Sequence, residues 1–487
     1  MRPRLQILSP ELLARIIDEA YELIATVGAK VASPEAREIL ASAGAHVEDG
    51  MARFPKALVQ RAVETVPKEF WLYNRAGEAV VHYGGDDVYF DPGSCCLKIL
   101  DSETQQPRLA VSEDLVRMIK VTEMLPEYAA QATAMVCNDV PGEMGDWYRL
   151  LLILLYSDKP IVTGAFSAQT LAIMLELLAA DSGGVDALRR KPRAVFDVCP
   201  SPPLNWSPFA SYNLVELGRA GVPAEIVSMP LAGATAPVTL AGSIVQHTAE
   251  CLSGITIHQL AKPGAPIVWG GAPAIFDMRT GNTPMGAIET AMLDAGAAEV
   301  GKWFGLPTHG YLVATDGHQI DAQAGMESSA SAIVGALAGI NMISGAGMLD
   351  ILACHSVEKL VIDAEAVASA QRLIAGVEAR TDVLALSMFA QTGLHGEFLK
   401  LKETRALFRK EQHFPSSITD RGGDPSAPDI LTRARQRVNE LLQNYQPPQI
   451  SSEVVKSLRA IAARHAKSVG LDRLPSVVTE DLSVKVG

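Results

Sequence analysis

The sequence predicts an α/β fold, a closed (β/α)8 TIM barrel with an N-terminal helical and β extension and additional C-terminal helices. From about residue 125 to 400, short apolar runs alternate with longer helical windows, as in right-handed βαβ units around a parallel sheet. Seven such units are countable, and no glycine fingerprint of an open dinucleotide-binding sheet interrupts them. We therefore divide the chain into an extension packed on the barrel (1–125), the barrel (126–400), and C-terminal helices with a tail (401–487).

The extension begins with helices and then changes to strands. Ser9-Pro10 and Ser33-Pro34 are helix-start signals, and Phe54-Pro55 opens a third helix. Between residues 70 and 110, short β-like runs are separated by Gly-Gly and Pro-Gly turns. A further helix is expected from Ser112, which precedes two acidic residues.

The barrel strands are the apolar runs that end in loops rich in Gly, Pro and polar residues. They are expected at 129–137, 160–166, 193–199, 225–230, 266–271, 308–313 and 341–344. The helices lie between them, at 146–155, 170–180, 207–220, 238–261, 287–304, 323–338 and 356–374. An eighth strand comes either from residues 385–391 or from the β-rich segment before residue 100. Beyond the barrel, helices are expected at 430–442 and 452–465, and the tail after Gly470 has little apolar pattern.

Composition excludes several classes of protein. The 487 residues carry a net charge of −13 without a basic stripe, so nucleic acid is not an expected partner. The N-terminus lacks the apolar core of a signal peptide, and no apolar run is long enough to span a bilayer. Six scattered cysteines are typical of reduced thiols, so we expect a cytoplasmic protein without membrane contact.

Catalytic side chains are expected in the loops after the strands, because barrel enzymes place their sites at the carboxyl ends of the strands. The densest polar loop, 314–327, contains Asp316, Gln323 and Glu327, and the last two share one helix face. Such a group can hold a cation or a water. The alternative is that Asp321 caps the helix and Glu327 pairs with a basic side chain.

Three more loops follow strands. Residues 200–207 present Asn205 and Trp206, or else only a capped helix start at Ser207-Pro208; residues 231–239 are rich in Gly and Ala, or else only a tight turn. Residues 345–355 end in His355, which is either a site residue or a structural histidine. No zinc spacing and no GxSxG elbow occurs, so we expect no catalytic metal and no serine nucleophile.

Several ordered motifs resemble the trimethylamine methyltransferase family over roughly residues 10 to 445. They are Leu100-Asp101, Lys159-Pro160-Ile161, the string 233–242, Gln246, Ala249-Glu250, Pro263–Pro266, Thr315-Asp316, the string 321–327, 338–341, 345–347 and 360–363. The resemblance implies a (β/α)8 barrel that moves a methyl group from an amine to the cobalt of a corrinoid (cobalamin) carried on a separate small protein. Because the sequence contains no pyrrolysine, it is similar to the glycine betaine branch, and a quaternary amine is the expected substrate rather than trimethylamine.

The resemblance also has a departure. Near the C-terminal end the family usually reads Gly-His-Phe-Leu and then His-Thr, whereas this chain has Gly396-Glu397-Phe398-Leu399 and Glu403-Thr404. Both histidines are replaced by glutamate, so the amine or the corrinoid partner can differ from the usual one.

A quaternary ammonium group has no proton to donate, so aromatic faces and carboxylates must hold it. The expected catalytic residues are Asp316, Glu327 and His355, and the expected substrate-binding residues are Asn205, Trp206, Gln323, Tyr311, Trp269 and Tyr89. The small residues expected at the corrinoid face are Gly233, Ala234, Thr235, Gly345 and Gly347. The expected partners are the cognate corrinoid protein, a small quaternary amine and further copies of the chain. The alternatives are a different barrel enzyme, such as a lyase, and a non-catalytic binder of a quaternary amine or a corrinoid protein.

Overall fold

The structure, a computed structural model, describes residues 2–423 and 425–479. Within these ranges, eight parallel strands close into a barrel and follow one another in chain order. They are β6 (Tyr89–Pro92), β9 (Gln131–Ala132), β10 (Ile161–Gly164), β11 (Ala194–Val198), β13 (Ala224–Ser228), β15 (Ile267–Gly271), β17 (His309–Tyr311) and β18 (Met342–Ala346). Parallel bridges Phe90–Tyr128 and Trp269–Thr308 join the two hydrogen-bonded sheets into a ring. The predicted (β/α)8 barrel is confirmed.

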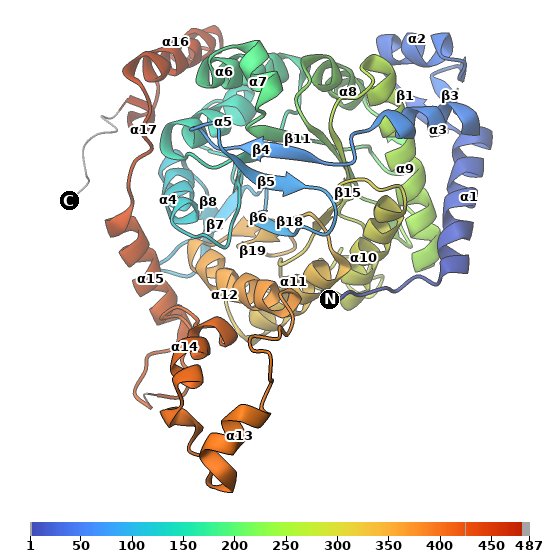
Figure 1. Ribbon diagram of the computed structural model, residues 1–487. Coiled ribbons are helices and arrows are strands. Elements are labelled where there is room, and N and C mark those ends of the chain that lie inside the picture. The colour runs from blue at the N-terminus through green and yellow to red at the C-terminus, as the bar shows by residue number, and fades with distance from the viewer. Residues whose placement is uncertain (1, 424, 480–487) are drawn as a thin grey trace.

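Each barrel strand is followed by a helix on the outside of the ring (Figure 1). These helices are α4 (Ser112–Glu123), α5 (Gly145–Tyr156), α6 (Ala168–Ser182), α8 (Pro208–Ala220), α9 (Leu240–Ala261), α10 (Ile288–Trp303), α11 (Ala322–Ala338) and α12 (Val357–Ile374). Side-chain oxygens of Ser167, Ser207, Thr239, Asp321 and Ser356 cap five of them. The capped helix start after Ser207 and the cap at Asp321 are therefore confirmed.

The eighth strand comes from the β-rich segment before residue 100. Strand β6 pairs with β18 in parallel, so the ring begins at Tyr89. Residues 385–391, the other alternative, lie mostly in helix α13 (Leu386–Thr392). The barrel thus takes its first strand from the segment that the sequence analysis placed in the extension.

The N-terminal extension packs on one side of the barrel. It contains α1 (Pro10–Thr26), α2 (Pro34–Ser42), α3 (Lys56–Thr65), β1 (Ala29–Val31), β2 (His46–Glu48) and β3 (Met51–Arg53). Helices α1, α2 and α3 contact α9, and β1 pairs with β12 (Asn205–Trp206) from the loop after β11. The extension therefore holds one of the loops at the carboxyl end of the barrel.

A hairpin closes the amino end of the barrel. Strands β4 (Phe70–Tyr73) and β5 (Ala79–Tyr83) pair antiparallel and lie across the barrel in blue in Figure 1. Its buried side chains form one apolar cluster with residues of the strands: Leu72, Val81, Tyr83, Ala130, Val162, Val195, Val268 and Met342. The hairpin therefore fills the bottom of the barrel, and a ligand can enter only from the carboxyl end.

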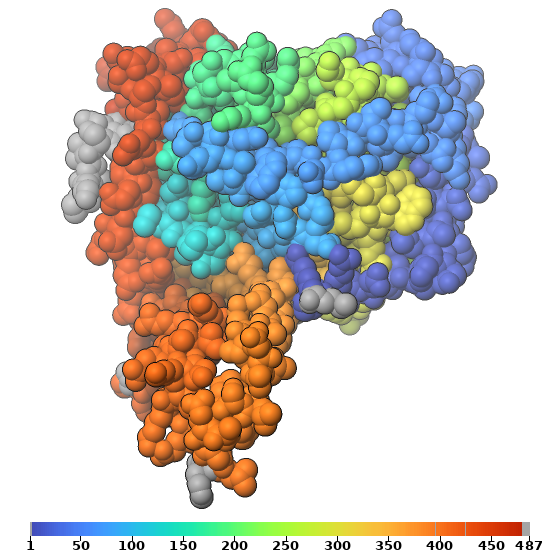
Figure 2. All heavy atoms as spheres, viewed as in Figure 1, coloured from blue at the N-terminus to red at the C-terminus, as the bar shows by residue number. Residues whose placement is uncertain are grey.

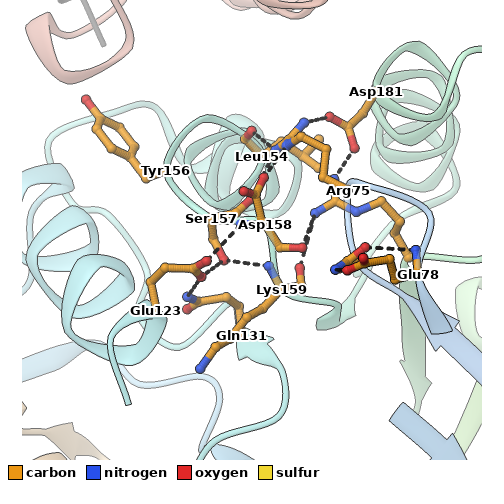
Figure 3. A network of polar contacts seen from close by, with 12 residues as sticks. Arg75, Glu78, Glu123, Gln131, Leu154, Tyr156, Ser157, Asp158, Lys159 and Asp181 are labelled. Atoms are coloured by element: carbon orange, nitrogen blue, oxygen red, sulfur yellow. Dashed lines mark hydrogen bonds and ion pairs between the residues drawn. The ribbon is translucent and has the colours of Figure 1, made fainter. Parts of the chain in front are cut away.

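A polar network holds this hairpin in place (Figure 3). Arg75, in the turn between the two strands, donates from Nε to Asp158 Oδ1 at 2.7 Å and forms an ion pair with Asp181. Beside it, Lys159 Nζ donates to three backbone carbonyls at 2.6–2.7 Å, and burial lowers the pKa of this lysine to about 8. Glu123 accepts a hydrogen bond from the Asp158 amide at 3.2 Å. The turn is thus fixed to α4, α5 and α6, and the hairpin is part of the barrel core.

Short strands decorate the carboxyl end, called the mouth here. They are β7 (Lys98–Leu100), β8 (Pro107–Leu109), β14 (Leu231–Ala232), β16 (Ala274–Ile275), β19 (Met348–Leu349) and β20 (Cys354–His355). Strands β19, β20, β7 and β8 form one sheet, and β14 pairs with β16. These pairings order the loops that follow β6, β13, β15 and β18.

The C-terminal helices run along the outside of the barrel. Helix α15 (Ile430–Asn444) packs on α12 and α4, and α16 (Ser452–Ser468) packs on α6 and α5, which confirms the two predicted helices. Helix α17 (Ser476–Thr479) follows, and Tyr156 Oη donates to the Val477 carbonyl at 2.6 Å. The short helix α7 (Val185–Arg190) lies between α6 and β11.

A small lobe projects from the barrel between α12 and α15 (Figures 1 and 2). Residues 376–415 of this lobe include α13 and α14 (Lys402–Glu411), with the 3-10 turns Gly393–His395 and Phe398–Lys400 between them. Leu394 is 97% exposed and Leu399 is 89% exposed. The two glutamates that depart from the family pattern, Glu397 and Glu403, belong to this lobe rather than to the mouth.

Candidate active site

Four ionisable side chains meet on the axis of the barrel, one layer above the apolar cluster. They are Asp91 from β6, Asp197 from β11, Glu225 from β13 and His309 from β17. His309 Nδ1 contacts Glu225 Oε1, and a Cβ added to Gly270 would lie 2.8 Å from both Glu225 Oε1 and His309 Cβ. We call these four residues the axial cluster. A glycine in β15 leaves the space that they occupy.

Burial keeps the axial cluster uncharged. It raises the pKa of Glu225 to about 8 and raises the pKa values of Asp91 and Asp197 well above their usual range. The carboxyls also raise one another's pKa by mutual repulsion. Burial lowers the pKa of His309 to about 4. At neutral pH burial therefore favours the protonated carboxyls and the neutral imidazole at the centre of the barrel.

The axial cluster has unused hydrogen-bonding capacity. Asp91 accepts a hydrogen bond from Ser344 Oγ at 2.7 Å. In contrast, Oδ1 of Asp197 and Nε2 of His309 are buried without a hydrogen-bond partner among the described residues, whereas Glu225 already contacts His309 Nδ1. Unpaired buried polar atoms are costly and mark places where a ligand or water belongs. Asp197 remains partly exposed, whereas Glu225 is completely buried, so the cluster is reached from the mouth.

Tyr311, a predicted substrate-binding residue, forms part of the wall above the axial cluster. Its hydroxyl accepts from the Ser94 amide and donates to the Ser94 carbonyl, both at 2.7 Å, and it contacts Met348 Sδ. The ring is 7% exposed, and burial raises the pKa of the hydroxyl well above its usual range. Tyr311 therefore holds the loop after β6 and offers a ring edge rather than a free hydroxyl.

The structure brings three predicted residues together at the mouth, beside β17. Glu327 accepts hydrogen bonds from the Asp316 amide at 2.9 Å and from Gln323 Nε2 at 2.9 Å, and it also contacts the Thr315 hydroxyl. Asp316 in turn accepts from the Met285 amide at 2.6 Å, and burial raises its pKa. Glu327 thus pairs with neighbouring donors and not with a basic side chain, contrary to the alternative in the sequence analysis.

His355 lies behind the wall of the mouth. Its ring is fully buried, and a Cβ added to Gly347 would lie 2.2 Å from it. Burial lowers the pKa of His355 to about 3, so the imidazole is neutral. His355 lies beneath Gly347 after β18, whereas Asp316 and Glu327 follow β17.

The predicted small residues fall into two groups. Gly233, Ala234 and Thr235 form the turn after β14, and Thr235 Oγ1 accepts from the Leu231 amide at 3.0 Å. This turn is on the surface of the mouth, and Ala234 is exposed. In contrast, Gly345 and Gly347 are buried. Those two glycines therefore serve the packing of β18 and do not present a surface to a macrocycle.

The remaining predicted residues lie elsewhere. Trp269 faces α10, where its Nε1 donates to the Ala297 carbonyl at 3.0 Å, and Trp206 faces α9, where it donates to Ser253 at 3.0 Å. Both indoles are completely buried, so neither is available to a ligand at the mouth. Tyr89 packs against the hairpin at the amino end of the barrel, the opposite end from the mouth. Asn205 pairs with β1 in the extension.

Sequence reasoning missed the axial cluster. A signal was present, because a single charged residue inside an apolar strand, as in Ala194–Val198 and Ala224–Ser228, is rare unless the side chain is functional or paired. Exposed apolar side chains also lie around the mouth. The exposed ones at the strand ends and in the adjoining loops are Phe166, Met229, Val238, Met278 and Met326, here called the rim.

Residues 2–423 and 425–479 contain no helix that is both long and apolar enough to cross a membrane. The same residues contain no group of three or more His, Cys, Asp or Glu side chains placed to hold a metal ion.

Comparisons with known proteins agree on one family. The family described as trimethylamine methyltransferase (MTTB) matches residues 1–470. The chain is 28% identical to the trimethylamine methyltransferase MttB of Desulfitobacterium hafniense, a match that covers 96% of this chain and 95% of that protein. It is 30% identical to trimethylamine methyltransferase MttB2 of Methanosarcina mazei, with 90% and 91% covered. It is 28% identical to the glycine betaine methyltransferase of Desulfitobacterium hafniense, with 96% and 98% covered.

A solved structure shows the same fold. The monomethylamine methyltransferase (MtmB) of Methanosarcina barkeri superimposes with a TM-score of 0.54 over 96% of this chain and 89% of that chain. The sequences are 14% identical, so this likeness concerns the fold alone.

Proposed function

We propose an activity for this chain from one premise: it belongs to the trimethylamine methyltransferase family. The proposed activity is transfer of a methyl group from a quaternary or tertiary amine, such as a betaine, to the Co(I) of a corrinoid carried by a separate protein. The observation that carries the proposal is the axial cluster, a set of uncharged buried acids at the centre of the barrel.

The axial cluster suits a cation that cannot donate a hydrogen bond. A trimethylammonium group needs negative charge and polarisable surface within about 6 Å. In the free protein the acids are protonated, so no uncompensated charge is buried. When the cation arrives, it favours loss of a proton from Glu225 or Asp197, because an opposite charge nearby lowers the pKa of a carboxyl. The charge thus forms only when the ligand balances it.

The chemistry requires positioning more than proton transfer. In a quaternary ammonium, or in a tertiary amine that carries a proton, the N–CH3 bond breaks, its electron pair stays on nitrogen, and the amine leaves neutral. The corrinoid supplies the cobalt nucleophile that accepts the methyl group. This chain must therefore hold the ammonium so that one methyl points out of the mouth, and it must exclude water from the axis. Once the positive charge is lost, the carboxylate attracts the product less, which favours its release.

The polar group at the mouth is a second proposed contact. Asp316 and Glu327 place negative charge above the axial cluster, and Gln323 borders them. We propose that Gln323, which donates one amide hydrogen to Glu327, donates the other to the carboxylate of a betaine, because this side chain is exposed at the mouth. His355 is proposed as a support of the wall through its contact with Gly347.

The rim supports a protein partner at the mouth. Phe166 is 56% exposed, Met278 is 67% exposed and Met326 is 68% exposed. Methionine and aromatic side chains around one opening are typical of an adaptable protein interface. A corrinoid protein docked on the rim would also exclude water from the axis.

The lobe supports a homo-oligomer. Its apolar side chains are largely exposed, and Leu401 is its one buried apolar side chain among the described residues of 376–415. An exposed apolar patch of this kind is typical of a surface that another protein covers. We propose that a second copy of the chain covers it.

The experiment uses the purified chain, chemically reduced cob(I)alamin and a panel of glycine betaine, carnitine, choline and trimethylamine. The expected result is methylcobalamin formation, followed by its absorbance, with at least one quaternary amine. Binding of an amine without methyl transfer, also after addition of the cognate corrinoid protein, would instead establish a non-catalytic binder. If no amine binds, the proposal is refuted.

A further inference from the structure

A separate cavity of about 560 Å³ lies at the amino end of the barrel, on the opposite side from the mouth. Four segments border it: β4, the end of α7, the end of α8 and the loop after α9. The last three of these segments each precede a barrel strand, namely β11, β13 and β15, whereas β4 belongs to the hairpin. Figure 2 shows this face, where the blue hairpin lies against the green and yellow-green helices. A volume of this size is that of a small-molecule site.

The lining is basic, although the chain is acidic. Arg189, Arg190, Arg219 and Lys262 border the cavity, and Glu69 is the one acidic residue of its lining. Glu69 Oε2 lies 3.3 Å from His82 Nε2. In a chain of net charge −13, a cavity with this balance attracts anions locally.

Two of these cations already have partners and two do not. Arg219 pairs with Glu35 at 2.6 Å and with Glu216 at 2.7 Å, and Arg189 Nε donates to the Ala220 carbonyl at 3.1 Å. Among the described residues, the exposed side chains of Arg190 and Lys262 make no hydrogen bond or ion pair. They are the groups free to bind a ligand.

Trp71 adds a flat platform beside these cations. One side of its indole stacks on His82, with ring centroids 4.6 Å apart and planes tilted by 31°. His82 is itself fixed, since its Nδ1 is 2.7 Å from Asp87. The indole is nevertheless 41% exposed in the cavity lining. An oriented ring with an open face can stack on a planar ligand.

We propose that this cavity binds a planar organic anion of mononucleotide size, with the ring on Trp71 and the phosphate or carboxylate between Arg190 and Lys262. A ring alone would not use the cations, and an inorganic anion would not use the indole. The volume of the cavity is that of a small ligand rather than of a protein segment. This site is independent of the methyl-transfer proposal, because it faces the other end of the barrel.

The test measures binding of AMP to the full chain by calorimetry and by quenching of tryptophan fluorescence, with adenosine, inorganic phosphate and nicotinate as comparison probes. One AMP should bind per chain, more tightly than adenosine or phosphate alone. Nicotinate binding as tightly as AMP would identify a carboxylate rather than a phosphate as the natural anion, and either result supports the site. Trp71→Leu should remove the quenching and weaken AMP binding more than phosphate binding.

The exposed cations allow a matched comparison. Arg190→Ala and Lys262→Ala should each weaken AMP binding about tenfold, because each removes one charge-assisted contact. Arg61→Ala removes another exposed arginine, on α3, which has no ion-pair partner within residues 2–423 and 425–479, and it should leave binding unchanged. All variants should keep the wild-type melting temperature. The proposal is overturned if no probe saturates, if the Arg190 and Lys262 variants bind AMP like wild type, if Arg61→Ala weakens it equally, or if only an acidic peptide binds.

Discussion

Glu225→Gln tests two consequences of a buried neutral acid. The first is a loss of stability as the pH rises, and the second is a gain in affinity for a cation. Glutamine has the shape of the protonated acid, so the substitution keeps the free protein's charge at neutral pH. In the folded chain the pKa of Glu225 is about 8, above its ordinary value of 4.5. A carboxyl whose pKa is raised on folding stabilises the protein below its unfolded pKa, and that contribution is lost as the pH rises toward the folded pKa. At pH 7 we therefore expect the variant to be more stable than wild type by ~3 kcal/mol, and equal to it near pH 4.5.

The same substitution should weaken cation binding. A cation ~4 Å from the carboxylate gains ~4 kcal/mol at an effective dielectric constant of 20. Ionising Glu225 at pH 7 costs ~1.4 kcal/mol, since the pKa lies about one unit higher. The difference, ~2.6 kcal/mol, corresponds to a dissociation constant roughly 80-fold weaker in the variant.

Calorimetry with glycine betaine between pH 6 and 9 measures this effect. Wild-type affinity should rise about tenfold per pH unit up to pH 8 and then level, because binding must release a proton below the pKa. The variant should show a flatter profile. Glu250→Gln is the matched control, because Glu250 is equally buried but accepts hydrogen bonds from Leu204 N and Ser228 Oγ outside the axis. A flat wild-type profile, or unchanged affinity in Glu225→Gln, would refute the reasoning.

Three further outcomes follow from the fold. Arg75→Ala should lower the free energy of unfolding by ~3 kcal/mol in denaturant titration, because it leaves a buried carboxylate with one partner fewer; a change below 1 kcal/mol would contradict the role of the network. Gly345→Ala should destabilise the chain by more than ~3 kcal/mol, because φ is +125° and the new Cβ would lie 2.0 Å from the Leu312 carbonyl oxygen; wild-type melting would show that β18 can shift. Leu394→Glu with Leu399→Glu should reduce the molar mass in light scattering to that of a monomer, and an unchanged oligomer would place the interface elsewhere.

The sequence predicted the barrel, but it did not decide which segment supplies the strand that completes the ring. Alternating apolar runs and helical windows predict the parallel strands because each βαβ unit repeats the same local pattern. The first barrel strand, Tyr89–Pro92, lies among short β-like runs, and two of the other runs form the hairpin that closes the amino end. The local sequence pattern does not distinguish a barrel strand from a strand of this hairpin. Pairing with β18, more than 250 residues later, decides the matter.

The sequence analysis placed the candidate site at the carboxyl end of the barrel, but it assigned the wrong strand face to aromatic residues such as Trp269. Side chains alternate along a strand, so Trp269 points outward if Val268 and Gly270 point inward. The register that fixes this parity comes from neighbouring strands and is absent from a single sequence. The pairing of Gln323 with Glu327 was predictable because a helix brings positions four apart together without help from the register.

The middle layer of the barrel is less completely filled by apolar side chains, which leaves room for the axial cluster. Other barrels fill this layer with branched apolar side chains, whereas here Gly164 and Gly270 leave space beside Asp197 and Glu225. Acids in such a place lower stability at neutral pH, as the raised pKa of Glu225 requires. A feature that costs stability and leaves buried polar atoms unpaired serves a ligand better than it serves the fold. Since a closed hairpin blocks the amino end, that ligand must enter where the rim surrounds the mouth, and there a second protein can meet it.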